Sequence, residues 1–117
     1  MISSKSATKT AKTMTPSQLG ALYDKEDKTA ERAGNAEERL MRAVSDVCRK
    51  TPALGAKADK IWELSSAKIE KLMNMTEKKV ENVKTNRAQR VTELRIKSLE
   101  TQIIIYQNGL VAVGKLK

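Results

Sequence analysis

Apolar residues recur at a fixed step of eleven along the second half of this chain. The first row that keeps this step consists of Ile61, Leu72, Val83, Leu94 and Ile105. A second row with the same step consists of Ile69, Val80 and Val91. Eleven residues make three helical turns of about 3.67 residues each, so each row stays on one side of an α-helix. The pattern therefore predicts a long helix that carries a continuous apolar stripe.

The stretch from residue 56 to residue 100 favours one uninterrupted, coiled-coil-like helix. It contains no glycine or proline, and it is rich in residues that cost little in a helix. Such a helix is about 70 Å long at ~1.5 Å per residue. A heptad repeat that starts at Met73 would place Arg87 and Arg90 in the apolar seam, so the eleven-residue step describes the stripe better. We expect other copies of the chain to cover this stripe, and an intramolecular helical hairpin or three-helix bundle is the open alternative.

The first half of the chain predicts a helical hairpin over residues 16–50. Thr15 and Pro16 supply an N-cap and a first-turn proline for the first helix. Gly34 and Asn35 tolerate the left-handed conformation that commonly ends a helix, so the first helix is expected to stop there. A proline and a glycine that follow the hairpin separate it from the long helix. The predicted fold is therefore mainly α, with two short helices before one long helix.

Residues 101–117 differ in character from the stretch before them. β-Branched residues flank Asn108 and Gly109, and this dipeptide is the strongest short signal for a hairpin turn. We predict a C-terminal β-hairpin here, although a lone two-stranded hairpin is marginal in water and needs a surface to pack on. The alternative is that the long helix continues to Gln107, with Asn108 and Gly109 as its C-cap and a tail beyond.

The positive charge of the chain points to an anionic partner. The formal net charge is +9, and charged residues make up 32% of the sequence. Residues 1–15 have little to bury and contain no acid, so we expect a disordered basic tail. A second basic stretch, residues 84–97, contains five cations and one acid. The candidate nucleic-acid contacts are Lys5, Lys9, Lys12, Lys84, Arg87, Arg90, Arg95 and Lys97.

The residues that support catalysis or metal binding are scarce. The chain has no histidine and one cysteine, Cys48, which argues against acid/base catalysis by histidine and against a zinc site. The acidic residues Asp24, Glu26 and Asp27 alternate with lysines and match no calcium-loop spacing, so they are interpreted as a solvated helix face. No phosphate-binding glycine motif is present. We therefore expect no enzymatic activity and no cofactor or metal.

These patterns predict a non-enzymatic, homo-oligomeric assembly protein that contacts nucleic acid without sequence preference. Nucleoprotein, packaging and virion-assembly proteins are of this type, and we expect it in the cytoplasm or within an assembled particle. The apolar run 103–113 is too short to span a membrane, so no membrane span is expected. The alternative is a protein adaptor or scaffold that binds other assembly proteins, such as a small component of a secretion or viral machine. The predicted oligomer interface consists of Ile61, Leu72, Val80, Val83, Val91, Leu94 and Ile105.

Overall fold

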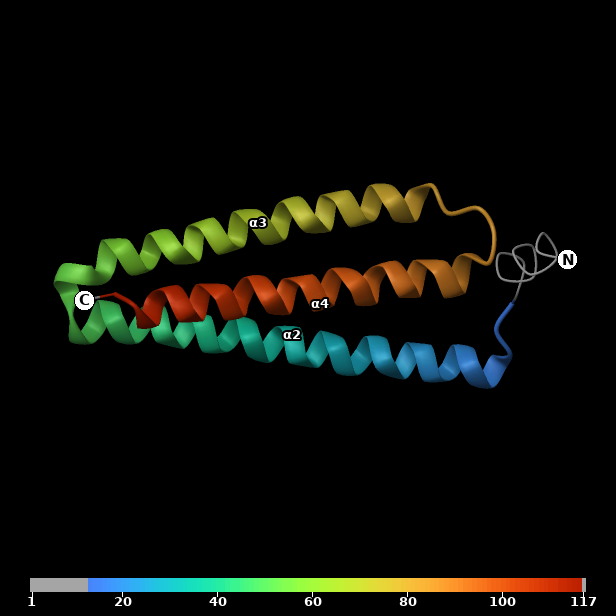
Figure 1. Cartoon of the computed structure of the whole chain (residues 1–117), viewed down its shortest axis with the longest axis horizontal. Coiled ribbons are helices and arrows are strands. Elements are labelled where there is room, and N and C mark those ends of the chain that lie inside the picture. Colours follow the sequence, from blue (N-terminus) through green and yellow to red (C-terminus); the bar gives the residue numbers. More distant parts are fainter. Residues whose placement is uncertain (1–12, 117) are drawn as a thin grey trace, which may run out of the picture.

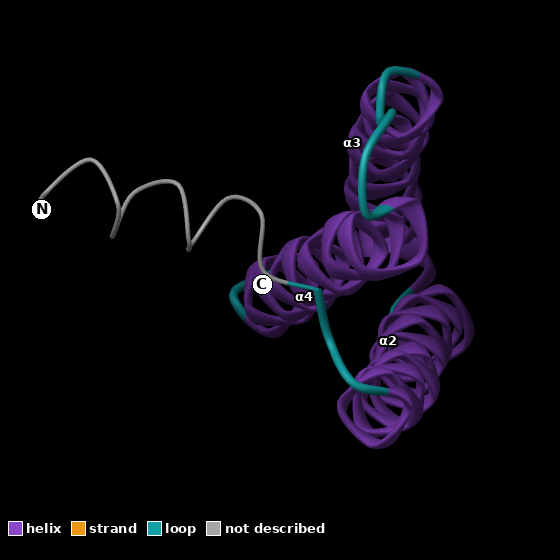
Figure 2. Cartoon of the chain, turned by 90° about the vertical axis from the view of Figure 1, so that its right-hand side faces the viewer, coloured by secondary structure: helices purple, strands orange, loops and turns teal. Residues whose placement is uncertain are grey.

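Three long helices lie side by side in the computed structural model, which describes residues 13–116. They are α2 (Pro16–Lys50), α3 (Gly55–Glu81) and α4 (Arg87–Gly114), and a short 3₁₀ turn, η1 (Pro52–Leu54), joins the first two. The chain runs up, down and up again, so α2 and α4 are parallel and α3 is antiparallel to both (Figure 1). The view from the end of the bundle places α4 between α3 and α2 (Figure 2). The expectation of a mainly α fold is confirmed.

The first helix, α2, runs without a break through Gly34 and Asn35. The prediction that these residues end a helix, and with it the helical hairpin over residues 16–50, is wrong. The physical reason is that the buried positions keep a helical spacing across the glycine, and the burial that they provide outweighs its helix cost of about 1 kcal/mol. The buried positions of α2 are Thr29, Ala33, Leu40 and Val44.

The N-terminus of α2 has the cap that the sequence predicts. The Thr15 side chain accepts a hydrogen bond of 3.2 Å from the Gln18 backbone N–H. The Gln18 side chain in turn accepts a hydrogen bond of 2.9 Å from the Thr15 backbone N–H. This reciprocal capping box satisfies two backbone donors that the helix leaves unpaired.

The predicted helix over residues 56–100 is interrupted, because α3 ends at Glu81 and α4 begins at Arg87. The connecting residues are Asn-Val-Lys-Thr-Asn, and four of the five are poor helix formers. Asn86 adopts the left-handed conformation, with φ 48° and ψ 45°, which asparagine tolerates better than most residues. The chain therefore reverses direction here without a glycine or a proline.

The predicted C-terminal β-hairpin is wrong, because α4 continues as a helix to Gly114 and no strand occurs within residues 13–116. Asn108 and Gly109 lie inside the helix and form no C-cap. The buried side chains of Ile103, Tyr106 and Val113 follow a helical spacing toward the neighbouring helices. Packing against α2 and α3 thus overrides the β propensity of the isoleucines and valines.

The reversal at residues 82–86 folds the two apolar rows back on themselves. Ile69, Val80 and Val91, the second row, are buried between the helices. The first row is half-buried along the seam between α3 and α4. Its two ends, Ile61 and Ile105, line one hollow of this seam, which also places them on facing helices. The single chain therefore covers much of its own stripe, as in the intramolecular alternative.

The bundle is an elongated rod of 64 × 24 × 24 Å. Its fully buried centre is Leu40 of α2, which belongs to an apolar cluster drawn from all three helices. Within the described residues, none of the helices combines the length and the apolar character needed to cross a membrane.

Candidate nucleic-acid interface

Most of the described cations that the sequence singled out gather at one end of the rod, around the α3–α4 connection. Lys84 lies in the connection, and Lys97 lines a hollow there together with Arg90 and Val83. Two lysines in the last turn of α3 join them. We call this set the basic end, and it consists of Lys78, Lys79, Lys84, Arg87, Arg90 and Lys97.

The described chain starts at the same end of the molecule. The Thr13 hydroxyl donates a hydrogen bond of 3.2 Å to the Asn86 side-chain oxygen in the α3–α4 connection. The predicted tail cations Lys5, Lys9 and Lys12 precede Thr13 in the chain and lie outside the described residues. The covalent attachment of this tail is therefore next to the basic end.

Arg87 has a structural partner that the sequence analysis did not anticipate. Its Nη1 atom donates hydrogen bonds of 2.9 Å each to the backbone oxygens of Val80 and Val83. These oxygens belong to the last turn of α3 and the residues just after it, where carbonyls lack helical donors and the helix dipole favours a cation. Arg87 therefore caps α3. Arg90 donates a longer bond of 3.2 Å to the Thr85 hydroxyl across the same connection.

Arg95 does not belong to the basic end. It lines a different hollow, on the side of α4 that faces the space between α2 and α3, where Glu26 and Glu77 are also exposed to the cavity. The five cations of residues 84–97 are thus divided between two sides of the bundle. The helical period of α4 therefore places cations that are close together in the sequence on different sides of the bundle.

The charges on α3 are sorted by sign, a feature that the sequence analysis missed. Successive residues of a helix are rotated by about 100° around its axis. On this basis the acids of α3 lie within an arc of roughly 40° around the axis, and its lysines lie within a separate arc of roughly 100°. The acids are Asp59, Glu63, Glu70, Glu77 and Glu81. The lysines, which we call the lysine ridge, are Lys57, Lys60, Lys68, Lys71, Lys78 and Lys79. The repeated steps of seven and eleven between like charges were the available signal.

The helix ends add to the positive potential at the basic end. Because α2 and α4 are parallel, both N-termini lie there, and each N-terminus carries a partial positive charge. The first turn of α4 contains no acid, and the Asn86 side chain makes no capping hydrogen bond in the described structure. Backbone N–H groups of α4 are therefore oriented toward this end without a side-chain acceptor.

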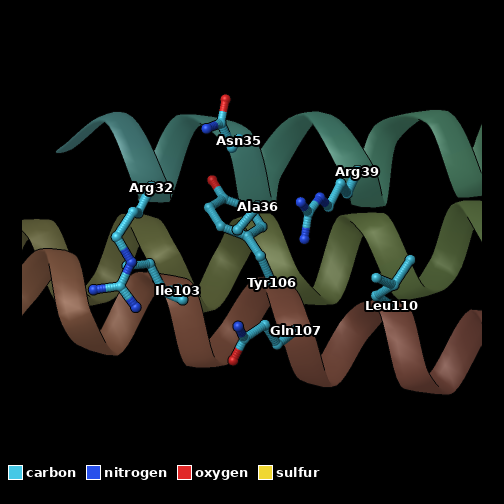
Figure 3. A pocket seen from close by; sticks show the side chains of 8 residues that line it. All are labelled: Arg32, Asn35, Ala36, Arg39, Ile103, Tyr106, Gln107 and Leu110. Carbon is cyan, nitrogen blue, oxygen red and sulfur yellow. The ribbon is translucent and has the colours of Figure 1, made fainter. Parts of the chain in front are cut away.

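Another hollow, lined by two arginines, lies between α2 and α4 midway along the rod. Its cavity volume is about 200 Å³, and Figure 3 shows Arg32 and Arg39 of α2 on either side of Tyr106 of α4. The ion pairs within residues 13–116 are Arg42 with Glu38 and Arg49 with Asp46, so neither lining arginine is paired there. This hollow suits a small anionic group, and the sequence analysis did not single out these two arginines.

The residues predicted as an oligomer interface divide between the core and a seam. Val80 and Val91 are buried inside the single chain, where they stabilise its own fold. The other five, which form the first apolar row, are half-buried between α3 and α4: Ile61, Leu72, Val83, Leu94 and Ile105.

Comparisons of this chain with protein-family models, with curated proteins and with solved structures gave no match.

Proposed function

We propose that this protein is a non-enzymatic assembly protein that contacts nucleic acid without sequence preference through its basic end. The observation that supports this is the gathering of six cations from two helices and their connection at one end of a rod. The six cations exceed the four acids that lie within four residues of them in the sequence, namely Glu77, Glu81, Glu93 and Glu100. The lysine-bearing residues before Thr13 join the bundle at the same end. A site in the cytoplasm or in an assembled particle fits this function.

The chemistry of this surface favours phosphates over bases. Lysine and arginine side chains neutralise phosphates and release counterions, so affinity falls steeply as salt rises. Base-specific or stacking contacts need aromatic platforms, and the whole chain has one tryptophan and two tyrosines. Tyr106 is buried in the bundle, which removes one of the three. We therefore expect similar affinities for unrelated duplexes.

The test is a fluorescence-anisotropy titration of two unrelated DNA duplexes at low and at physiological salt. The triple variant Lys84→Gln, Arg90→Gln and Lys97→Gln removes three contacts and leaves Arg87 in place to cap α3. Its affinity at low salt should fall about 10-fold or more, and the slope of log K against log salt should decrease by up to about 3.

A matched control removes the same charge at the opposite end of the rod, where α2 and α4 end and α3 begins. The variant Lys50→Gln, Lys57→Gln and Lys115→Gln should bind nearly as well as the parent protein, apart from a small effect of net charge. Tight binding to one duplex at high salt, or equal weakening in both triple variants, would contradict the proposed interface.

A protein adaptor or scaffold is the second candidate function, for example as a component of a secretion or viral machine. The observation that favours it is the exposure of large apolar side chains, among them Tyr23, Met41 and Met73, of which Met73 lines the space between α2 and α3. Exposed apolar side chains that cluster commonly mark protein contacts. Under this alternative, the basic-end variant keeps its activity, whereas polar substitutions beside that space abolish partner binding.

A further inference from the structure

An open groove runs between α2 and α3, and α4 forms its floor. Two adjoining hollows make up this groove, with cavity volumes of about 270 and 280 Å³, and Met73 lines both. Glutamates project from both walls, and apolar side chains lie between them. We call this the acidic groove and define it by Glu26, Ala30, Glu37, Glu70, Met73 and Glu77.

The acidic groove combines negative charge with exposed apolar surface. Met73 is 51% exposed although it lies at the junction of the two hollows. Tyr23 precedes Ala30 by seven residues, so it lies on the same side of α2 and extends the apolar surface. Among the described residues, Arg95 is the one cation that lines the hollows. The groove therefore suits a helix with an apolar centre and basic flanks.

The lysine ridge of α3 has this composition and faces outward. The buried residues of α3 are centred about 120° from the ridge on one side, and the acids are centred about 120° from it on the other. Leu64 is 52% exposed and Met75 is 49% exposed, and both lie among the lysines. A convex helix surface thus presents two apolar side chains with cations on both sides.

The spacings of the two surfaces match. Glu26 and Glu37 are eleven residues apart on α2, and Lys60 and Lys71 are eleven residues apart on α3. Eleven residues correspond to about 16 Å along a helix, so both lysines of one ridge can meet both glutamates of one wall. The acid and lysine arcs of α3 are centred about 120° apart, so a chain cannot place its own ridge in its own groove.

We propose that the lysine ridge of a second copy of this chain docks in the acidic groove. The inserted helix would pack as a fourth helix against α2, α3 and α4, with Leu64 and Met75 on the apolar surface around Met73. Because groove and ridge are different surfaces, the contact is head-to-tail and leaves one groove and one ridge free. The proposal rests on the assembly role in the proposed function, to which it adds self-association as the means, and it does not depend on nucleic-acid contact.

The test measures the mass of the full chain by light scattering from low to high micromolar concentration. The parent protein should associate as concentration rises, and high salt should weaken this association. The groove variant Glu70→Lys, Glu77→Lys and the ridge variant Lys60→Glu, Lys71→Glu should each raise the dissociation constant by about 10-fold or more. An equimolar mixture of the two variants should recover association, because it contains one unaltered groove and one unaltered ridge.

The control Lys25→Glu, Lys28→Glu changes the net charge as much as the ridge variant does, but on α2 away from the groove. It should associate like the parent protein. Circular dichroism and thermal unfolding check that each variant folds. If the ridge variant does not fold, the milder variant Lys60→Gln, Lys71→Gln takes its place. Any of three results would overturn the proposal. The parent chain could be monomeric at every concentration, the groove and ridge variants could associate like the parent, or their mixture could fail to recover association. DNA titration of the same variants distinguishes failure of this proposal from failure of the proposed nucleic-acid contact. The ridge and groove variants retain Lys84, Arg90 and Lys97, so they test docking without removing these cations of the basic end.

Discussion

Gly109 of α4 lies against Leu40 of α2 so closely that a Cβ atom at position 109 would be 2.9 Å from the Leu40 Cδ2 atom. The same Cβ would be 2.9 Å from the Ser65 hydroxyl oxygen of α3. Leu40 is fully buried, so its side chain would have to repack within the core to make room. The absence of a side chain at Gly109 therefore lets all three helices approach one another at this level.

Substitution of this glycine should destabilise the bundle, although alanine favours helix. For Gly109→Ala, overpacking costs about 1–3 kcal/mol and the gain in helix propensity offsets about 1 kcal/mol, so we expect a net loss of about 1 kcal/mol. The matched control is Gly34→Ala, because a Cβ there meets nothing within 4 Å, and it should add about 0.5–1 kcal/mol. Urea unfolding followed by circular dichroism gives both values, and stabilisation by both substitutions would contradict the close contact.

Tyr106 should make the stability sensitive to alkaline pH. Its hydroxyl donates a hydrogen bond of 3.1 Å to Glu37, and burial, this hydrogen bond and the charge of Glu37 raise the pKa of Tyr106 from 10.0 to about 12. The unfolded chain therefore loses this proton first, so the contribution is complete below about pH 10 and is lost as the pH rises toward about 12.

The substitution Tyr106→Phe isolates this effect. It should lower the free energy of unfolding by about 1 kcal/mol at neutral pH through the lost hydrogen bond. The difference between parent and variant should then shrink between about pH 10 and 12, because only the parent carries the Tyr106 hydroxyl that loses its proton in this range. Unfolding curves recorded across this range check the prediction, and a difference that grows with pH would exclude it.

Arg87 should matter for folding more than its exposed neighbours do. Arg87→Met keeps the aliphatic stem and removes the donors to Val80 and Val83, so we expect a loss of about 1 kcal/mol. Arg90→Met removes one exposed bond to Thr85 and should cost less than about 0.5 kcal/mol. Thermal unfolding of the two variants provides the comparison, and equal losses would argue against a specific capping role.

The thiol of Cys48 should react slowly at neutral pH. Desolvation, the negative charge of Asp59 and a hydrogen bond of 3.6 Å from Sγ to the Asp59 carboxylate all raise the pKa of Cys48 above 9.0. Asp59→Asn removes the charge and should speed alkylation by iodoacetamide at pH 7–8, by up to about tenfold for each unit that the pKa falls. Glu63→Gln is the control, and slower alkylation in the Asp59 variant would show that another group sets the reactivity.

The sequence predicted helix correctly for most of residues 16–100, but it predicted the helix ends and the C-terminal stretch less well. The N-cap at Thr15 was predicted because it depends on adjacent residues, Thr15 and Pro16, whereas the capping box with Gln18 was not predicted. The reversal at residues 82–86 was missed because no glycine or proline marks it, and only the summed weakness of two asparagines, a valine and a threonine signals it. The helix through Asn108 and Gly109 was missed because its stability comes from contacts with α2 and α3.

The candidate site was also only partly visible in the sequence. Lys84, Arg90 and Lys97 were identified by local charge density, which does not depend on the fold. Arg95 was grouped with them because one-dimensional spacing does not show which neighbouring helix covers each side of α4. Lys78 and Lys79 join the same end because α3 terminates there, and that termination was not predicted.

The sequence by itself determined the helical class, the eleven-residue apolar rows, the cap at Thr15 and the excess of positive charge, because each depends on the local period and chemistry of the chain. The tertiary structure decided where the long stripe folds, that Gly34 and Gly109 lie inside helices, that Arg87 caps α3, and that Arg95 lies apart from the other cations of residues 84–97. Those outcomes depend on burial between segments distant in the chain, where packing free energy exceeds local propensities of about 1 kcal/mol per residue.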